Sequence, residues 1–249
     1  MNVHLKIPTS WNELSQIQLE NVCNLLHYHH KESEESSESK QELYLAICRE
    51  LIRSNNMKAV HYALKELPAS ELVKYCEFIF KTIARTDFES TLKLFPFNYF
   101  PPGNRLNNIS IDEFSFADGV YYHWRKTGNI EFLNLLCATL YRPKPWWHIF
   151  RTNKQDKRIA FNRFEVESRS EKLKDVPFNK KLSIAFTFEG CRNHLVNSRP
   201  HTFPKGEEDS NATYQGFRKI ILAKSGSKFG SFTETSKVLA VDFLNDMEE

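Results

Sequence analysis

Three segments of this sequence pair a serine with a glutamate three residues later, next to apolar residues spaced three or four apart. The pairs are Ser10 with Glu13, Ser110 with Glu113 and Ser231 with Glu234. In such a capping box each side chain accepts a hydrogen bond from the backbone N–H of the other residue, which satisfies donors that the first turn of a helix leaves unpaired. The pattern predicts helix starts at these three places and therefore a largely helical fold.

Apolar stripes with helical spacing recur along most of the chain. They predict about eight helices in one globular, bundle-like all-α domain over residues 1–249. The main segments are 11–29, 43–52, 57–67, 70–80, 110–127, 130–141, 182–196, 214–224 and 231–246. A minor β-hairpin near Phe97 or Phe161 is the expected exception.

Composition excludes several classes of protein. The 249 residues are 41% hydrophobic and 13% aromatic, which is too apolar for a disordered chain. The five cysteines are widely spaced, so we expect buried thiols and no disulfide framework. No apolar run approaches the ~20 residues of a membrane helix, and the first residues lack the apolar core of a signal peptide. We therefore expect a cytoplasmic protein with no membrane partner.

Two segments depart from this helical pattern. Residues 31–40 are rich in glutamate and serine and have no apolar side chain, which predicts a flexible acidic loop. Residues 142–174 hold ten basic and four acidic residues, a net charge of +6, and we expect a basic irregular excursion that ends in a helix from about Glu165.

The sequence contains no motif that predicts catalysis. Cys23, His27 and His30 share one side of a helix, but no fourth zinc ligand is near them in sequence, so we predict no metal. Cys191 is followed by Arg192, yet no histidine or acid stands at a recognisable spacing from it. We accordingly predict no cofactor and no catalytic residue, and interpret the chain as a non-enzyme.

Asp118 is the most informative charged residue, because it lies on an apolar helical stripe between Phe114 and Tyr121. A buried carboxylate must be paired or hydrogen-bonded. We predict a structural polar clamp made of Asp118, Arg142 and Arg192, with Arg125 as another candidate partner. The alternative is that Asp118 is an active-site acid.

Several blocks of the sequence resemble a group of largely uncharacterised proteins from tailed-phage and prophage gene clusters. The resemblance spans most of the chain and is carried by Pro8–Leu14, Leu106–Phe114 with Phe116–Asp118, Leu140–Pro143, Glu189–Asn193 and Phe229–Gly230. These motifs are helix starts, helix ends and aromatic residues, so they bear on fold more than on mechanism. The resemblance implies a tail-module component or assembly factor, located in a bacterial host cell or associated with the virion.

We therefore predict a protein that acts through contacts with a protein partner, such as a phage tail component. The residues predicted to bind that partner are Trp146, Trp147, Val241, Phe243 and Leu244. Nucleic acid is the alternative partner, because segment 142–174 interleaves basic and aromatic side chains in the way that phosphate contact and base stacking require.

Overall fold

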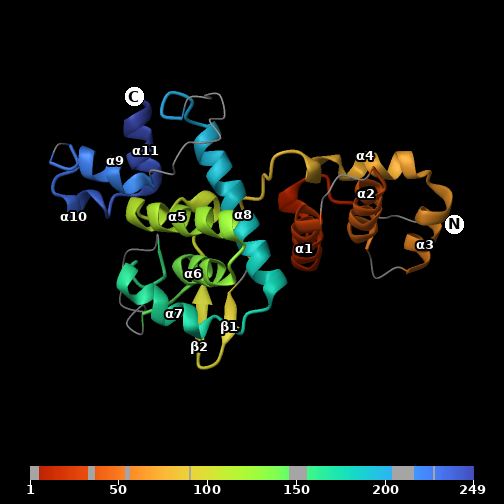
Figure 1. Cartoon of the computed structure of the whole chain (residues 1–249), viewed down its shortest axis with the longest axis horizontal. Coiled ribbons are helices and arrows are strands. Elements are labelled where there is room, and N and C mark those ends of the chain that lie inside the picture. The colour runs from red at the N-terminus through yellow and green to blue at the C-terminus, as the bar shows by residue number, and fades with distance from the viewer. Residues whose placement is uncertain are drawn as a thin grey trace. The chain divides into compact units, whose positions relative to one another are not determined.

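The computed structural model of the chain describes residues 6–32, 37–53, 57–89, 91–145, 156–203, 216–226 and 228–249. It is mostly helical with one small antiparallel sheet (Figure 1), which confirms the predicted all-α fold with a minor hairpin. The sequence predicted one domain over residues 1–249, whereas the chain divides into two compact units. The first unit consists of Met1–Arg85 and Pro177–Gly190, and the second of Thr86–Val176 and Cys191–Glu249.

The first unit is built from helices α1 to α4 and the beginning of α8. Its helix α1 packs on α2, and α2 packs on α4. The Gln18 side chain of α1 donates to the carbonyls of Glu50 and Leu51 at 3.2 and 3.0 Å, which satisfies acceptors at the end of α2. The bounds of these helices are α1 Gln16–Glu32, α2 Ser37–Ile52, α3 Met57–Glu66, α4 Ala69–Phe80 and α8 Phe178–Asn197.

The start of α1 differs from the prediction. Residues Trp11–Glu13 form a separate 3-10 turn, and the Glu13 carboxylate accepts the backbone N–H of Thr9 at 2.8 Å. The capping box forms five residues later, where the Gln18 side chain accepts the N–H of Ser15 at 3.0 Å and the Ser15 hydroxyl accepts the N–H of Gln18 at 3.4 Å. Serine with glutamine fits this motif as well as serine with glutamate does.

The predicted loop at 31–40 is shorter than expected, because both of its ends are helical. Helix α1 continues through Glu32 and α2 begins at Ser37, while residues 33–36 lie outside the described part of the chain. Glutamate and lysine are good helix formers, and neighbouring apolar turns are enough to extend a helix over them.

The second unit surrounds the helix pair α5 (Ile111–Thr127) and α6 (Ile130–Leu140). The Ser110 hydroxyl accepts the N–H of Glu113 at 3.2 Å, as the capping prediction required at the start of α5. The helix ends at Gly128, whose φ of 66° is a left-handed conformation that glycine adopts without strain. The end of α8 also belongs to this unit, with α7 Val166–Lys172, α9 Gly216–Lys224, α10 Phe232–Thr235 and α11 Ala240–Glu248.

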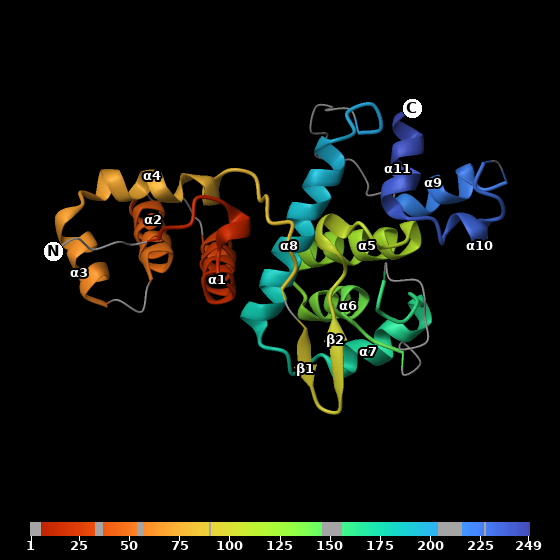
Figure 2. The ribbon, with the colours of Figure 1, turned by 180° about the vertical axis from the view of Figure 1, so that it is seen from behind.

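A three-stranded antiparallel sheet lies beside α6 and α7 (Figure 1 and Figure 2). Its order is β1 (Leu92–Leu94), β2 (Phe97–Phe100) and β3 (Arg142–Pro143), and Phe100 of β2 pairs with Arg142 of β3. The predicted hairpin near Phe97 is confirmed, whereas Phe161 lies in no strand.

The basic segment 142–174 is more regular than predicted. It begins as β3 and ends in a 3-10 turn at Arg163–Glu165 followed by α7, as the sequence indicated from about Glu165 onwards. Residues 146–155 lie outside the described part of the chain.

The predicted C-terminal helix is interrupted. Ser231 and Glu234 form a complete capping box, but α10 ends at Thr235 and α11 starts at Ala240. Between them Val238 accepts the N–H of Ile111 at 2.9 Å, and the N–H of Ala240 donates to the Ile109 carbonyl at 2.9 Å. These strand-like bonds take the backbone groups that a continuous helix would have used.

Candidate binding site

The residues predicted to bind a partner are not gathered on one exposed surface. Phe243 and Leu244 are completely buried and Val241 is half-buried, so the prediction is wrong for the first two. The reason is that α11 packs on α5, and the Phe243 ring also meets the ring of Phe229, between α9 and α10, at 5.5 Å between ring centroids. Trp146 and Trp147 lie outside the described residues.

The polar clamp exists as a pair. Asp118 is buried, and its carboxylate accepts a hydrogen bond of 2.5 Å from Nε of Arg192, which confirms those two residues. Arg142 belongs to a different group of charges. It begins β3, separated by one residue from the end of α6, and bonds to Glu113 instead.

Glu113, Arg142, Asp156 and Arg158 form a charged cluster, in which Asp156 is partly exposed and the other three residues are buried. The Glu113 carboxylate is bonded by Arg142 at 2.9 Å and by Arg158 at 3.1 Å. Asp156 lies 2.8 Å from Arg158 and 3.4 Å from Arg142. No local pattern indicates this cluster, because Glu113 fits a capping box, whereas in the structure its carboxylate bonds to the two arginines.

Burial affects the two arginines differently. Desolvation lowers the pKa of Arg142, and the opposing effect of the Glu113 charge does not restore it. For Arg158 desolvation also acts to lower the pKa, but Glu113 and Asp156 together raise it overall. Among the described residues, Nε and Nη1 of Arg142 have no acceptor, and each such buried donor costs about 1–3 kcal/mol.

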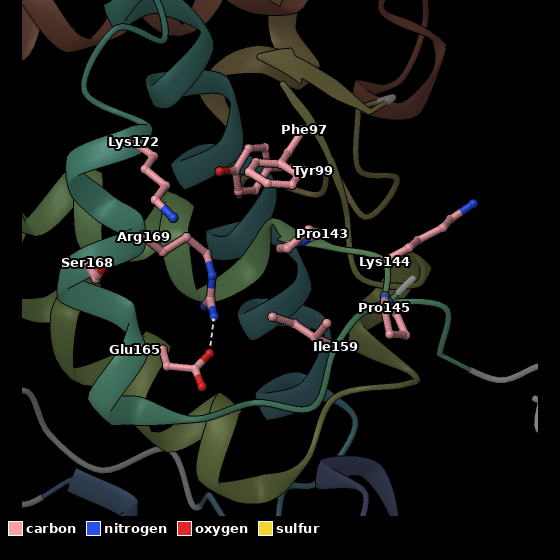
Figure 3. A pocket seen from close by; sticks show the side chains of 10 residues that line it. All are labelled: Phe97, Tyr99, Pro143, Lys144, Pro145, Ile159, Glu165, Ser168, Arg169 and Lys172. Carbon is pink, nitrogen blue, oxygen red and sulfur yellow. Dashed lines mark hydrogen bonds and ion pairs between the residues drawn. The ribbon is translucent and has the colours of Figure 1, made fainter. Parts of the chain in front are cut away.

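A pocket of about 480 Å³, here called the hairpin pocket, lies between the strands and α7 (Figure 3). Phe97 and Tyr99 reach it from the same face of β2, because alternate residues of a strand share a face. Pro143 and Ile159 line it beside the aromatic rings, and the opposite wall consists of Ser168, Arg169 and Lys172 of α7 with Glu165 of the preceding 3-10 turn.

The hairpin pocket is apolar on one wall and cationic on the other. The guanidinium of Arg169 is held by the Ala138 carbonyl at 3.0 Å and by Glu165 at 3.2 Å, and burial lowers its pKa. In Figure 3 the Lys172 ammonium points towards the pocket, whereas Lys144 points away from it and lies 3.9 Å from the centre of the Phe100 ring. The ammonium of Lys172 is therefore the charge that the pocket offers to a ligand.

One exposed aromatic side chain lines this pocket, and a second lies two residues before it in the hairpin turn. Phe97 is 51% exposed, and Phe95 at the hairpin turn is fully exposed. The signal in the sequence was the aromatic run from Phe95 to Phe100. It did not reveal the pocket, because the opposite wall comes from residues about seventy positions later in the chain.

A second pocket, of about 460 Å³, is lined by the charged cluster and is here called the arginine pocket. Its other walls come from three places: the residues just before α5, the segment around Phe161, and the segment around Lys237. The remaining lining residues are Asn108, Ser110, Ala160 and Leu239.

The cysteines and histidines considered as metal ligands or nucleophiles do not form a reactive site in the described part of the chain. All five cysteines are buried thiols, as predicted. The His27 ring lies against Tyr28 and Phe178 in the first unit, and the side chain of His30 lies outside the described residues. In the described ranges, no three histidine, cysteine or acidic side chains gather closely enough to hold a metal ion.

Comparison with protein-family models, with curated proteins and with solved structures gives no match to this chain. In the part of the chain that the structure describes, none of the helices has the length and apolar character needed to cross a membrane.

Proposed function

We propose that the chain is a non-enzymatic protein that binds a protein partner through the hairpin pocket, and that this partner is a component of a phage or phage-like tail module. The observation that carries the binding proposal is the half-exposed ring of Phe97 in the lining of a pocket of about 480 Å³, with the fully exposed Phe95 two residues before it in the hairpin turn. The resemblance to proteins of tailed-phage gene clusters supports the tail module.

The physical argument begins with exposure. Single exposed apolar residues are common, but an exposed aromatic that lines a pocket, with a second exposed aromatic two positions away, is typical of an interaction surface. Interface energy is concentrated in a few residues that fill such pockets, surrounded by contacts that contribute little. Phe97, Tyr99 and Ile159 supply the apolar walls for such an anchor.

The charge of the pocket indicates the kind of segment that fits. Arg169 is already bonded to Glu165 and to the Ala138 carbonyl, while the Lys172 ammonium faces the space. A partner segment with one apolar anchor and a nearby carboxylate would bury the anchor between the strands and α7 and place the carboxylate near Lys172.

Co-purification from phage-induced cells tests the proposal. We expect the double variant Phe95→Ala with Phe97→Ala to lose a tail-module partner that the wild type captures after nuclease treatment. Its circular dichroism should be unchanged, because Phe95 is fully exposed, Phe97 is half-exposed, and neither belongs to the core. Phe164, which is 89% exposed and does not line the pocket, supplies the matched control Phe164→Ala. Equal capture by the double variant and the wild type would contradict the proposal.

Single-stranded nucleic acid is the second candidate ligand. It is favoured by the presence of Lys172 and Arg169 opposite two aromatic rings, a combination that suits phosphate contact with base stacking. Binding of an oligonucleotide that weakens steeply with salt and is lost in Lys172→Glu would support it. Lys144→Glu is the matched control, since Lys144 points away from the pocket.

A further inference from the structure

The arginine pocket lies on the other side of β3 from the hairpin pocket. Arg142 of β3 lines the arginine pocket, and the next residue, Pro143, lines the hairpin pocket. Successive residues of a strand point to opposite faces. The two pockets therefore have separate walls, and binding at the arginine pocket does not require a partner at the hairpin pocket.

The charges around the arginine pocket do not balance. Within the charged cluster the two carboxylates of Glu113 and Asp156 match the two guanidinium groups of Arg142 and Arg158. Lys237 also lines the pocket and adds one positive charge. The lining therefore has a net charge of +1, which suits a ligand with one negative group.

Arg142 has hydrogen-bonding capacity that the cluster does not use. A guanidinium carries five N–H groups. Only Nη2 of Arg142 bonds to Glu113 and Asp156, and its Nε and Nη1 find no acceptor among the described residues. The side chain is 1% exposed, so these donors are also shielded from water. Buried N–H groups without an acceptor are rare in folded proteins and call for a partner.

We propose that the arginine pocket binds a small anionic ligand, whose phosphate or carboxylate group accepts hydrogen bonds from Arg142 and pairs with Lys237. Paired oxygens match the geometry of a guanidinium better than a single acceptor does. The pocket, at about 460 Å³, is larger than a bare anion requires, and Phe161 and Leu239 give part of it an apolar lining. The ligand is accordingly a small molecule with an acidic group and an apolar part.

Calorimetric titration of the full chain with inorganic phosphate and with acetate, in low-salt buffer, tests the site. We expect one of these probes to bind with one site per chain. Stronger binding of phosphate would assign a phosphorylated ligand, and stronger binding of acetate a carboxylic acid. Arg142→Ala should abolish binding. That variant removes a buried charge and can fail to fold. Lys237 is exposed, so Lys237→Ala should fold normally and is the decisive variant.

Lys237→Ala should weaken binding by about tenfold, the effect of losing one charge-assisted contact. Lys81→Ala, an exposed lysine of the first unit, is the matched control and should bind as the wild type does. The proposal is overturned if neither anion binds the wild type. It is equally overturned if Lys237→Ala binds as tightly as the wild type, or if Lys81→Ala weakens binding as much as Lys237→Ala.

Discussion

The carboxylate of Asp118 in α5 accepts a 2.5 Å hydrogen bond from Nε of Arg192 in α8. Asp118 is buried, whereas the side chain of Arg192 is 37% exposed. Loss of the carboxylate would therefore leave a cation that water can partly solvate. This asymmetry decides how much the pair contributes to stability.

We expect Asp118→Asn to lower the free energy of unfolding by about 1.5–3 kcal/mol, the usual contribution of a hydrogen bond to a charged group. The loss should stay below the ~3–5 kcal/mol that follows when a fully buried charge is left unpaired. Urea denaturation measures it. Glu171→Gln, which removes an exposed ion pair with Lys174, is the control and should cost about 1 kcal/mol or less. If both variants lose equally little, the buried pair does not stabilise the fold.

Glu113→Gln should be more destabilising than Asp118→Asn. The Glu113 carboxylate serves two arginines that are each 1% exposed, so its neutralisation leaves two buried guanidinium groups that share the single carboxylate of Asp156. We expect a loss of about 3–5 kcal/mol in urea denaturation. The neighbouring variant Asp112→Asn affects a partly exposed pair with Arg163 and should cost about 1 kcal/mol or less. A small loss for Glu113→Gln would show that the cluster is not held by this carboxylate.

Gly190→Ala should destabilise the protein although alanine is the better helix former. A Cβ at position 190 of α8 would lie 2.1 Å from the backbone carbonyl oxygen of Arg85, and backbone cannot move aside as a flexible side chain can. Helix propensity alone predicts a gain of about 1 kcal/mol, while overpacking of this kind costs about 1–3 kcal/mol or more. Thermal unfolding should therefore occur at a lower temperature than in the wild type. His194→Ala, at an exposed position of the same helix, is the control.

The sequence predicted those parts of the fold that depend on local signals. Ser110 precedes the first turn of α5, as its capping box predicts, and the segment 182–196 lies in α8, as its helical spacing predicts. The pairing of Asp118 was predictable because a carboxylate on an apolar stripe needs a partner, and Arg192 was among the candidates.

The parts that the sequence did not predict depend on contacts between distant residues. Glu113 satisfied a local pattern, yet its carboxylate bonds to Arg142 and Arg158, which are 29 and 45 positions away. The apolar residues of α11 were read as a surface for a partner, because periodicity shows that a face is apolar but does not show what covers it. Phe243 and Leu244 are instead part of the core.

Tyr99, in the wall of the hairpin pocket, should make the stability of the protein fall at alkaline pH. Burial raises the pKa of its hydroxyl above the ordinary value, and the nearby charge of Arg169 only partly offsets this effect. The unfolded chain then loses the proton near pH 10, at a pH where the folded chain still retains it. In this window the folded state binds more protons than the unfolded state. The contribution of Tyr99 to stability is therefore complete below about pH 10 and falls as the pH rises from there towards the folded pKa.

We expect the free energy of unfolding, measured in urea between pH 8 and pH 11, to decline less steeply for Tyr99→Phe than for the wild type. Tyr62 is 60% exposed, so Tyr62→Phe should decline as the wild type does. Parallel pH profiles for Tyr99→Phe and the wild type would mean that the Tyr99 hydroxyl is as well solvated in the folded protein as in the unfolded chain.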